Sequence, residues 1–125
     1  NQLLPFFGME RVFDGDNLVY HVGRRTAFAI QPCAPEFEND RFVQNGVGLH
    51  HHCFRARSRE DVDKAHQYLI EIGAKIVHFP EEGGWAPGYY SVLFEDPIGI
   101  RLEVNYVPGN GVLSESAGFD PSGDF

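Results

Sequence analysis

The fold is decided by a stretch that opens with Gly48-Leu-His-His-His-Cys-Phe-Arg-Ala56 and closes with Glu95-Asp-Pro-Ile-Gly-Ile-Arg-Leu-Glu-Val104. An amphipathic helix pattern and a loop rich in glycine and proline lie between these two segments. Taken in order, the stretch predicts strand, helix, strand, loop, strand, turn and strand. The rest of the chain is interpreted as a partner of this unit.

The helix inside this stretch has a clear beginning and end. Ser58 is the expected N-cap, and acidic residues in the following turn favour the helix macrodipole. Gly73 is the expected stop after the last turn. Apolar residues recur every three or four positions and predict one buried stripe, made of Val62, Ala65, Leu69 and Ile72. Strands are expected over residues 50–57, 75–79, 89–95 and 100–106, with a loop over 80–88 and a turn over 96–99.

The first part of the chain repeats the end of this unit. A hairpin over residues 9–22 and a strand over 26–31 are expected. The segment 23–32 aligns with 99–108, because glycine, arginine and proline recur at matching positions. Ala27 falls at the position of Glu103. We therefore predict a partial first module with its connector over residues 1–46, a complete module over 47–108, and a flexible tail over 109–125.

Composition excludes several kinds of partner. The chain has 125 residues, a net charge of −8 and 42% apolar residues, and no Lys/Arg cluster that could neutralise phosphates. We therefore expect neither nucleic acid nor an anionic membrane surface as a partner. Two cysteines do not make a disulfide framework, and no apolar run approaches the roughly 20 residues of a membrane span. A cytoplasmic location is expected.

Polar side chains share one face in two of the expected strands. Alternate strand residues point to the same side, so His51 and Arg55 share a face, as do Arg101, Glu103 and Asn105. If these two strands are neighbours, His51 and Glu103 converge. An imidazole nitrogen and a carboxylate oxygen are suitable ligands for Zn, Ni, Mn or Fe(II). The structural alternative for Glu103 is an ion pair with Arg101 or Arg55.

Other histidines are further candidates. At most one or two of the consecutive residues His50, His51 and His52 can meet one metal, because neighbours in a strand point to opposite faces. His78, in the next strand, could be a general base or an extra ligand. The alternative for each of them is a hydrogen-bonded or exposed histidine.

The loop over 80–88 carries aromatic residues. Two glycines precede Trp85, so this loop could close over a site as a lid, or Trp85 could plug a core edge. Tyr89 and Tyr90 point to opposite faces, so only one of them can line a cavity.

On these residues the chain resembles the vicinal oxygen chelate superfamily, which includes glyoxalase I, extradiol dioxygenases, and fosfomycin and bleomycin resistance proteins. The resemblance rests on Gly48–Asp63, on Gly73-Ala-Lys-Ile76, and on Pro87–Val104 with its Glu-Asp-Pro-x-Gly-x-x-Leu-Glu ending. It is strong over residues 47–108 and weak over 3–46. It implies an α+β fold of paired βαβββ modules that form a half-barrel cavity, here with the first module truncated at its N-terminus.

The resemblance also implies a metal site and a function. The family's ligands fall on His51 and Glu103, but Ala27 replaces the first module's carboxylate. Either water, substrate, His78 or a second chain completes the shell around a divalent metal, or no metal is bound. The first hypothesis is a metal-dependent lyase, isomerase, dioxygenase or thiol transferase, with His78 or Tyr90 assisting.

Two alternatives stay open beside this enzyme. One is a non-catalytic protein that binds a small molecule, as bleomycin resistance proteins do, and the other is a degenerate module kept for interaction. The resemblance further implies a homodimer.

Overall fold

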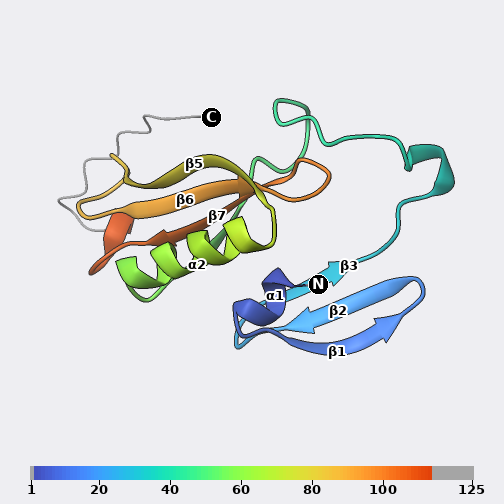
Figure 1. The fold of residues 1–125 in the computed structure, drawn as a ribbon, viewed down its shortest axis with the longest axis horizontal. Coiled ribbons are helices and arrows are strands. Elements are labelled where there is room, and N and C mark those ends of the chain that lie inside the picture. The colour runs from blue at the N-terminus through green and yellow to red at the C-terminus, as the bar shows by residue number, and fades with distance from the viewer. Residues whose placement is uncertain (1, 114–125) are drawn as a thin grey trace. The chain divides into compact units, whose positions relative to one another are not determined.

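The computed structural model describes residues 2–113 and confirms an α+β fold with two sheets (Figure 1). Cα packing divides the chain into two compact units, Asn1–Asp40 and Arg41–Phe125. Of the predicted tail over 109–125, residues 114–125 lie outside the described residues, which end in the 3-10 helix η2 (Gly111–Leu113). Among residues 2–113, no helix is long and apolar enough to cross a membrane.

The first unit is a small antiparallel sheet with one short helix. The helix α1 (Leu3–Phe6) precedes the strands β1 (Glu10–Gly15), β2 (Leu18–Val22) and β3 (Ala27–Ile30), which follow each other in the order β1-β2-β3. The predicted hairpin and third strand are thus confirmed. A 3-10 helix, η1 (Pro35–Phe37), interrupts the predicted connector.

The second unit is a four-stranded sheet covered by one helix. Its strands are β4 (His52–Arg55), β5 (Lys75–Glu82), β6 (Tyr90–Glu95) and β7 (Arg101–Tyr106), in the order β4-β7-β6-β5. β4 and β7 pair in parallel, and the other neighbours pair antiparallel. The first and last strands of the unit are therefore direct neighbours, as the convergence of His51 and Glu103 requires.

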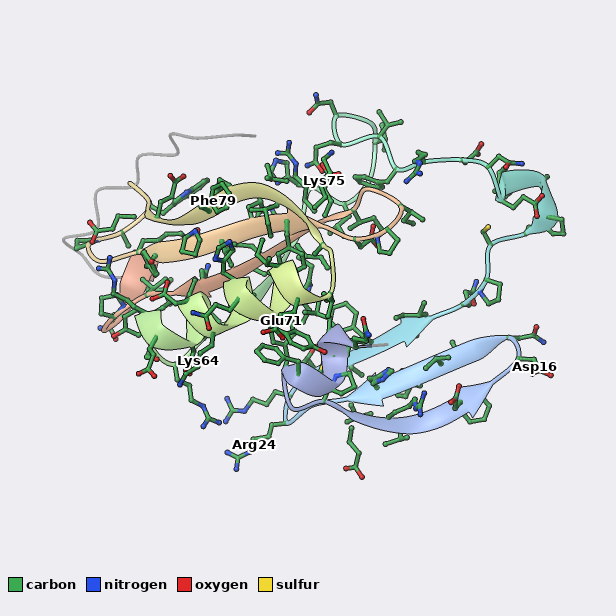
Figure 2. The ribbon with its side chains drawn as sticks, viewed as in Figure 1. Asp16, Arg24, Lys64, Glu71, Lys75 and Phe79 are labelled. Carbon is green, nitrogen blue, oxygen red and sulfur yellow. The ribbon has the colours of Figure 1, made fainter. Side chains whose placement is uncertain are left out.

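The covering helix, α2 (Arg59–Glu71), begins and ends where the sequence predicts. The backbone N–H of Asp61 donates to the Ser58 hydroxyl over 3.1 Å, and Gly73 ends the helix with φ of 72°. Three of the four predicted stripe residues are buried, namely Val62, Ala65 and Leu69, whereas Ile72 is half-buried. The opposite face carries charged residues, among them Lys64 and Glu71 (Figure 2).

Two strands differ from the prediction by two or more residues at an end. β5 does not stop before Pro80 but continues to Glu82, because it is an edge strand and its register shifts between His78 and Glu81. A proline is tolerated at such an irregular edge, where its missing N–H breaks no ladder bond. The first strand of the unit is shorter than predicted, since pairing with β7 begins only at His52.

The two units end their helices in the same way. Gly8 and Gly73 have φ of 74° and 72°, and the next N–H in each unit donates to the carbonyl of a buried leucine, Leu4 or Leu69. In each unit three antiparallel strands follow in sequence order. These matches support the predicted repeat, whereas the absence of an opening strand from the first module stays a prediction.

Candidate functional site

Strand register separates β7 into an apolar face and a polar face. Val104 pairs with Val92, and Glu103 pairs with Leu93. The hydroxyl of Tyr90, which lies on the Val92 side of β6, donates to Asp63 of α2 over 2.8 Å. The even-numbered residues of β6 therefore face the helix, and Glu103 lies on the opposite face of the sheet.

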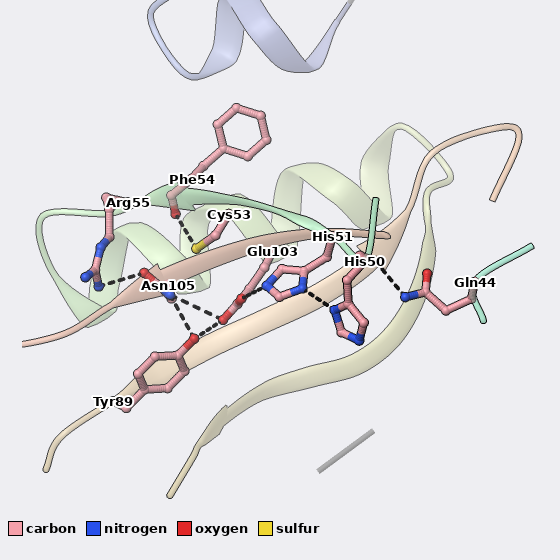
Figure 3. A network of polar contacts seen from close by, with 9 residues as sticks. All are labelled: Gln44, His50, His51, Cys53, Phe54, Arg55, Tyr89, Glu103 and Asn105. Atoms are coloured by element: carbon pink, nitrogen blue, oxygen red, sulfur yellow. Dashed lines mark hydrogen bonds and ion pairs between the residues drawn. The ribbon is translucent and has the colours of Figure 1, made fainter. Parts of the chain in front are cut away.

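Six polar residues meet on this opposite face, from β4, β7 and the segments next to them (Figure 3). We call this set the Glu103 network; it consists of His50, His51, Arg55, Tyr89, Glu103 and Asn105. Its centre is the Glu103 carboxylate, whose residue is only 7% exposed. A buried carboxylate is costly unless it is hydrogen-bonded, so its partners matter.

Each oxygen of Glu103 faces protein donors. The Tyr89 hydroxyl donates to Oε1, and Nδ2 of Asn105 lies 3.4 Å from the same oxygen. Nε2 of His51 lies 3.1 Å from Oε2. The predicted convergence of His51 and Glu103 is therefore what the structure has, although His51 precedes the paired part of β4.

The network continues outward on both sides of the carboxylate. Nδ2 of Asn105 donates to the Tyr89 hydroxyl over 2.8 Å, and Oδ1 of Asn105 accepts from the Arg55 guanidinium over 3.1 Å. On the other side, Nδ1 of His51 lies 2.6 Å from Nδ1 of His50. Arg55 therefore bonds to the amide of Asn105 in this network.

Burial near the carboxylate keeps two groups protonated. Desolvation by burial, followed by the charge of Glu103, raises the pKa of the Cys53 thiol to about 12. Burial, followed by the hydrogen bond to Glu103, raises the pKa of the Tyr89 phenol well above its usual range. Neither group can act as a base or a thiolate near neutral pH, so Tyr89 is a hydrogen-bond donor.

The predicted assistants lie outside the network. His78 pairs with Leu93, two strands from Glu103, and strand spacing puts their backbones about 10 Å apart. Nδ1 of His78 lies 2.9 Å from the Phe79 carbonyl oxygen. Tyr90 faces α2.

The loop between β5 and β6 packs an aromatic pair against the network. The rings of Trp85 and Tyr89 lie 6.4 Å apart, and Trp85 is half-buried. A Cβ at Gly83 would lie 3.0 Å from the Trp85 ring and 3.1 Å from the Tyr89 ring, so a glycine lets both rings approach the backbone. Trp85 thus supports Tyr89 from one side; its role as a lid stays a prediction.

Sequence reasoning placed two members of the network and missed the part played by Tyr89. Alternation along the strand showed that only one of Tyr89 and Tyr90 could line the site, and the prediction named Tyr90, whereas Tyr89 is the one that bonds to Glu103. The choice depends on the register between β6 and β7, where Tyr90 pairs with Tyr106 on the helix side. Asn105 shares a strand face with Glu103, and its side chain donates to the Tyr89 hydroxyl. The polar residue at this position was therefore the one sequence signal that Glu103 has further polar partners.

The donor set does not complete a metal site. Protein sites for zinc use three or four protein ligands, and the predicted set provides only His51 and Glu103. Within residues 2–113, no group of three or more His, Cys, Asp or Glu side chains could hold a metal ion. Both oxygens of Glu103 already face protein donors. By themselves the described residues do not fit a resident metal, so metal ligation by His51 and Glu103 stays a prediction.

Comparisons with known proteins point to one family. Residues 6–104 match the family model described as Glyoxalase/Bleomycin resistance protein/Dioxygenase superfamily. A candidate glyoxalase from Bacillus halodurans is similar, with 29% identity, a TM-score of 0.72, and coverage of 83% of this chain and 79% of that chain. A lactoylglutathione lyase from Agrobacterium tumefaciens is 25% identical, with a TM-score of 0.57 and coverage of 84% and 80%.

A further structural likeness concerns the fold alone. A glyoxalase/bleomycin resistance protein/dioxygenase family enzyme from Burkholderia phytofirmans is 17% identical, with a TM-score of 0.64 and coverage of 84% of this chain and 82% of that chain. No curated protein matches the chain.

Proposed function

Because the chain belongs to the glyoxalase/bleomycin resistance protein/dioxygenase superfamily, we propose that it binds a small oxygen-bearing molecule at the Glu103 network. One observation carries the proposal: a buried carboxylate with convergent donors lies on the sheet face that α2 does not cover. Small-molecule sites place a few polar groups in this manner within otherwise apolar surroundings.

Four residues of the network have a distinct role in this proposal. Oε2 of Glu103 accepts a hydrogen bond from the bound molecule, while His51 lies beside it as a second polar contact. Tyr89 and Asn105 hold Oε1. An involvement of His78 or Tyr90 stays a prediction, and neither reaches the carboxylate in this conformation.

A second candidate is a divalent-metal-dependent lyase, isomerase or dioxygenase. The approach of His51 Nε2 to Glu103 Oε2 favours it, because an imidazole and a carboxylate are two ligands that Zn, Ni, Mn or Fe accepts. The remaining ligands would have to come from outside the described residues. The name of the Agrobacterium tumefaciens relative makes lactoylglutathione lyase a natural first assay.

Metal analysis and ligand screening separate these candidates. Elemental analysis is done on protein purified without chelator and again after incubation with Zn, Ni, Mn and Fe(II). Near-stoichiometric metal that is lost in a His51→Ala, Glu103→Gln double variant would support the enzyme. A small-molecule screen by NMR tests binding itself.

The binding proposal makes a specific demand on that screen. Hits should shift resonances around Glu103 in the wild type and lose affinity at least tenfold in Glu103→Gln, because the acceptor charge is gone. Glu10→Gln is the matched control, since Glu10 lies exposed on β1 in the other unit. Hits that bind equally well to Glu103→Gln would refute the proposed site.

A further inference from the structure

Arg55 determines the direction of every hydrogen bond on its side of the Glu103 network. A guanidinium has only donors, so the atom of Asn105 that faces it must be the carbonyl oxygen, Oδ1. The amide nitrogen then faces Tyr89 and Glu103. The side-chain orientation of Asn105 is therefore fixed by its chemical partners, although carbonyl and amide ends have nearly the same shape.

The same logic continues to the carboxylate. Since Asn105 donates to the Tyr89 oxygen, the Tyr89 proton is left for Oε1 of Glu103. Oε1 thus receives donors from Tyr89 and Asn105 and has no room for another partner of this kind.

The opposite oxygen is approached by a more accessible group. Oε2 faces Nε2 of His51, whose side chain is 32% exposed. With Nε2 of His51 donating to Oε2, its Nδ1 is free to accept from Nδ1 of the exposed His50. All donors in the network therefore point toward one carboxylate, and Oε2 is the oxygen beside the solvent-accessible residue.

We propose that the hydrogen-bond chain from Arg55 through Asn105 to Tyr89 occupies Oε1 of Glu103 and leaves Oε2 as the single oxygen that engages a ligand. Because Oε2 is an acceptor, the site selects molecules that donate a hydrogen bond through O–H or N–H. Arg55, Asn105 and Tyr89 are positioning residues in this scheme. The proposal rests on the proposed function for its ligand, but the hydrogen-bond direction can be tested without one.

The ligand-free test compares two substitutions of Arg55. Arg55→Lys keeps a side chain that can only donate. Arg55→Met removes the donor, so that Oδ1 of Asn105 loses its hydrogen bond from residue 55. In ¹H–¹⁵N spectra, the side-chain amide protons of Asn105 should exchange slowly in the wild type and in Arg55→Lys. In Arg55→Met they should exchange about tenfold faster. Equal exchange rates in all three proteins would overturn the proposed direction.

The ligand test uses a fragment library in which each O–H or N–H donor is paired with its methylated analogue. We expect the donor of each pair to shift the resonances of His51 and Glu103, and the methylated analogue to bind at least tenfold more weakly. Tyr89→Phe should increase the affinity for fragments that carry two donors, because Oε1 becomes available as a second acceptor. Tyr90→Phe should leave all affinities unchanged, because Tyr90 faces α2.

The outcomes separate the two proposals. Methylated analogues that bind as well as donors would overturn the selection of donors while the binding function stands. A library without any fragment at Glu103 would refute the proposed function and the selection with it, and the exchange measurement would still decide the direction of the network.

Discussion

At the residue scale, Tyr89 is the side chain on which the stability of buried Glu103 depends most directly. Tyr89→Phe removes a donor from Oε1 and leaves only Asn105 on that oxygen. We expect the free energy of unfolding to fall by about 1.5–3 kcal/mol, the usual contribution of a hydrogen bond to a charged group. Urea unfolding of the variant beside Tyr90→Phe measures this.

The neighbouring tyrosine provides a matched control for that change. Tyr90 loses an exposed hydrogen bond to Asp63 in Tyr90→Phe, so its unfolding free energy should change by less than about 0.5 kcal/mol. If the two variants unfold at the same urea concentration, the Tyr89 hydroxyl does not stabilise the carboxylate.

Cys53 gives the fold a dependence on alkaline pH. Its folded-state pKa of about 12 lies above the ordinary value of 9.0, because burial and Glu103 disfavour the thiolate. The native state therefore keeps a proton that the unfolded state loses. This contribution to stability is complete below pH 9.0 and is lost as pH rises toward about 12.

A comparison of two cysteine variants measures that dependence. Between about pH 8 and about pH 10, Cys53→Ala should lose about 1 kcal/mol less unfolding free energy than the wild type, as linkage requires. Cys33→Ala, at an exposed position, should lose as much as the wild type. Unfolding is followed in urea with a reductant present. Parallel pH curves for Cys53→Ala and the wild type would contradict the assigned pKa.

At the element scale, local chemistry made α2 predictable and left β5 in part unpredictable. The cap, the buried stripe and the glycine stop of α2 all depend on residues close in sequence, so they could be identified from the sequence. Pro80 also predicted a strand end from local sequence, and that prediction was wrong, since β5 continues to Glu82. Its effect depends on whether the strand lies at a sheet edge, which is set by the distant strand order β4-β7-β6-β5.

The Ser58 cap is the part of α2 that a single substitution tests best. Ser58→Ala removes the oxygen that accepts from the Asp61 backbone, and we expect a loss of about 1 kcal/mol in unfolding free energy. Ser58→Asp keeps an acceptor at the helix N-terminus and should unfold close to the wild type. Both variants are measured by urea unfolding. Equal losses of unfolding free energy in the two would show that the side-chain acceptor at position 58 does not stabilise the helix.

At the scale of the whole molecule, the sequence predicted the repeat and half of the site. The alignment of Gly23 with Gly99 predicted the repeat, although only Gly99 has a positive φ. Gly8 and Gly73, which lie outside the aligned segments, are the glycines that share a backbone geometry. Strand alternation brought His51 and Glu103 together once β4 and β7 proved to be neighbours. Tyr89 comes from a third segment, and only the β6–β7 register places it on the carboxylate.

The predicted homodimer is tested at an exposed apolar face of the first unit. On the first unit's sheet, one face carries the exposed apolar residues Phe13, Tyr20 and Val22. Exposed apolar patches of this kind favour association, so we expect a dimer in sedimentation velocity at micromolar concentration. Phe13→Asp should shift the population to monomer, because a charge would be buried in the contact.

Phe37 provides the control for this prediction. Phe13 and Phe37 are both 54% exposed, but Phe37 lies on η1 in the connector and not on the sheet. Phe37→Asp carries the same change in charge and side chain, so any general effect on solubility or net charge appears in both variants. A dimer that persists in Phe13→Asp, or dissociates equally in Phe37→Asp, would exclude the sheet face as the contact. A monomer in the wild type at every concentration would refute the homodimer itself.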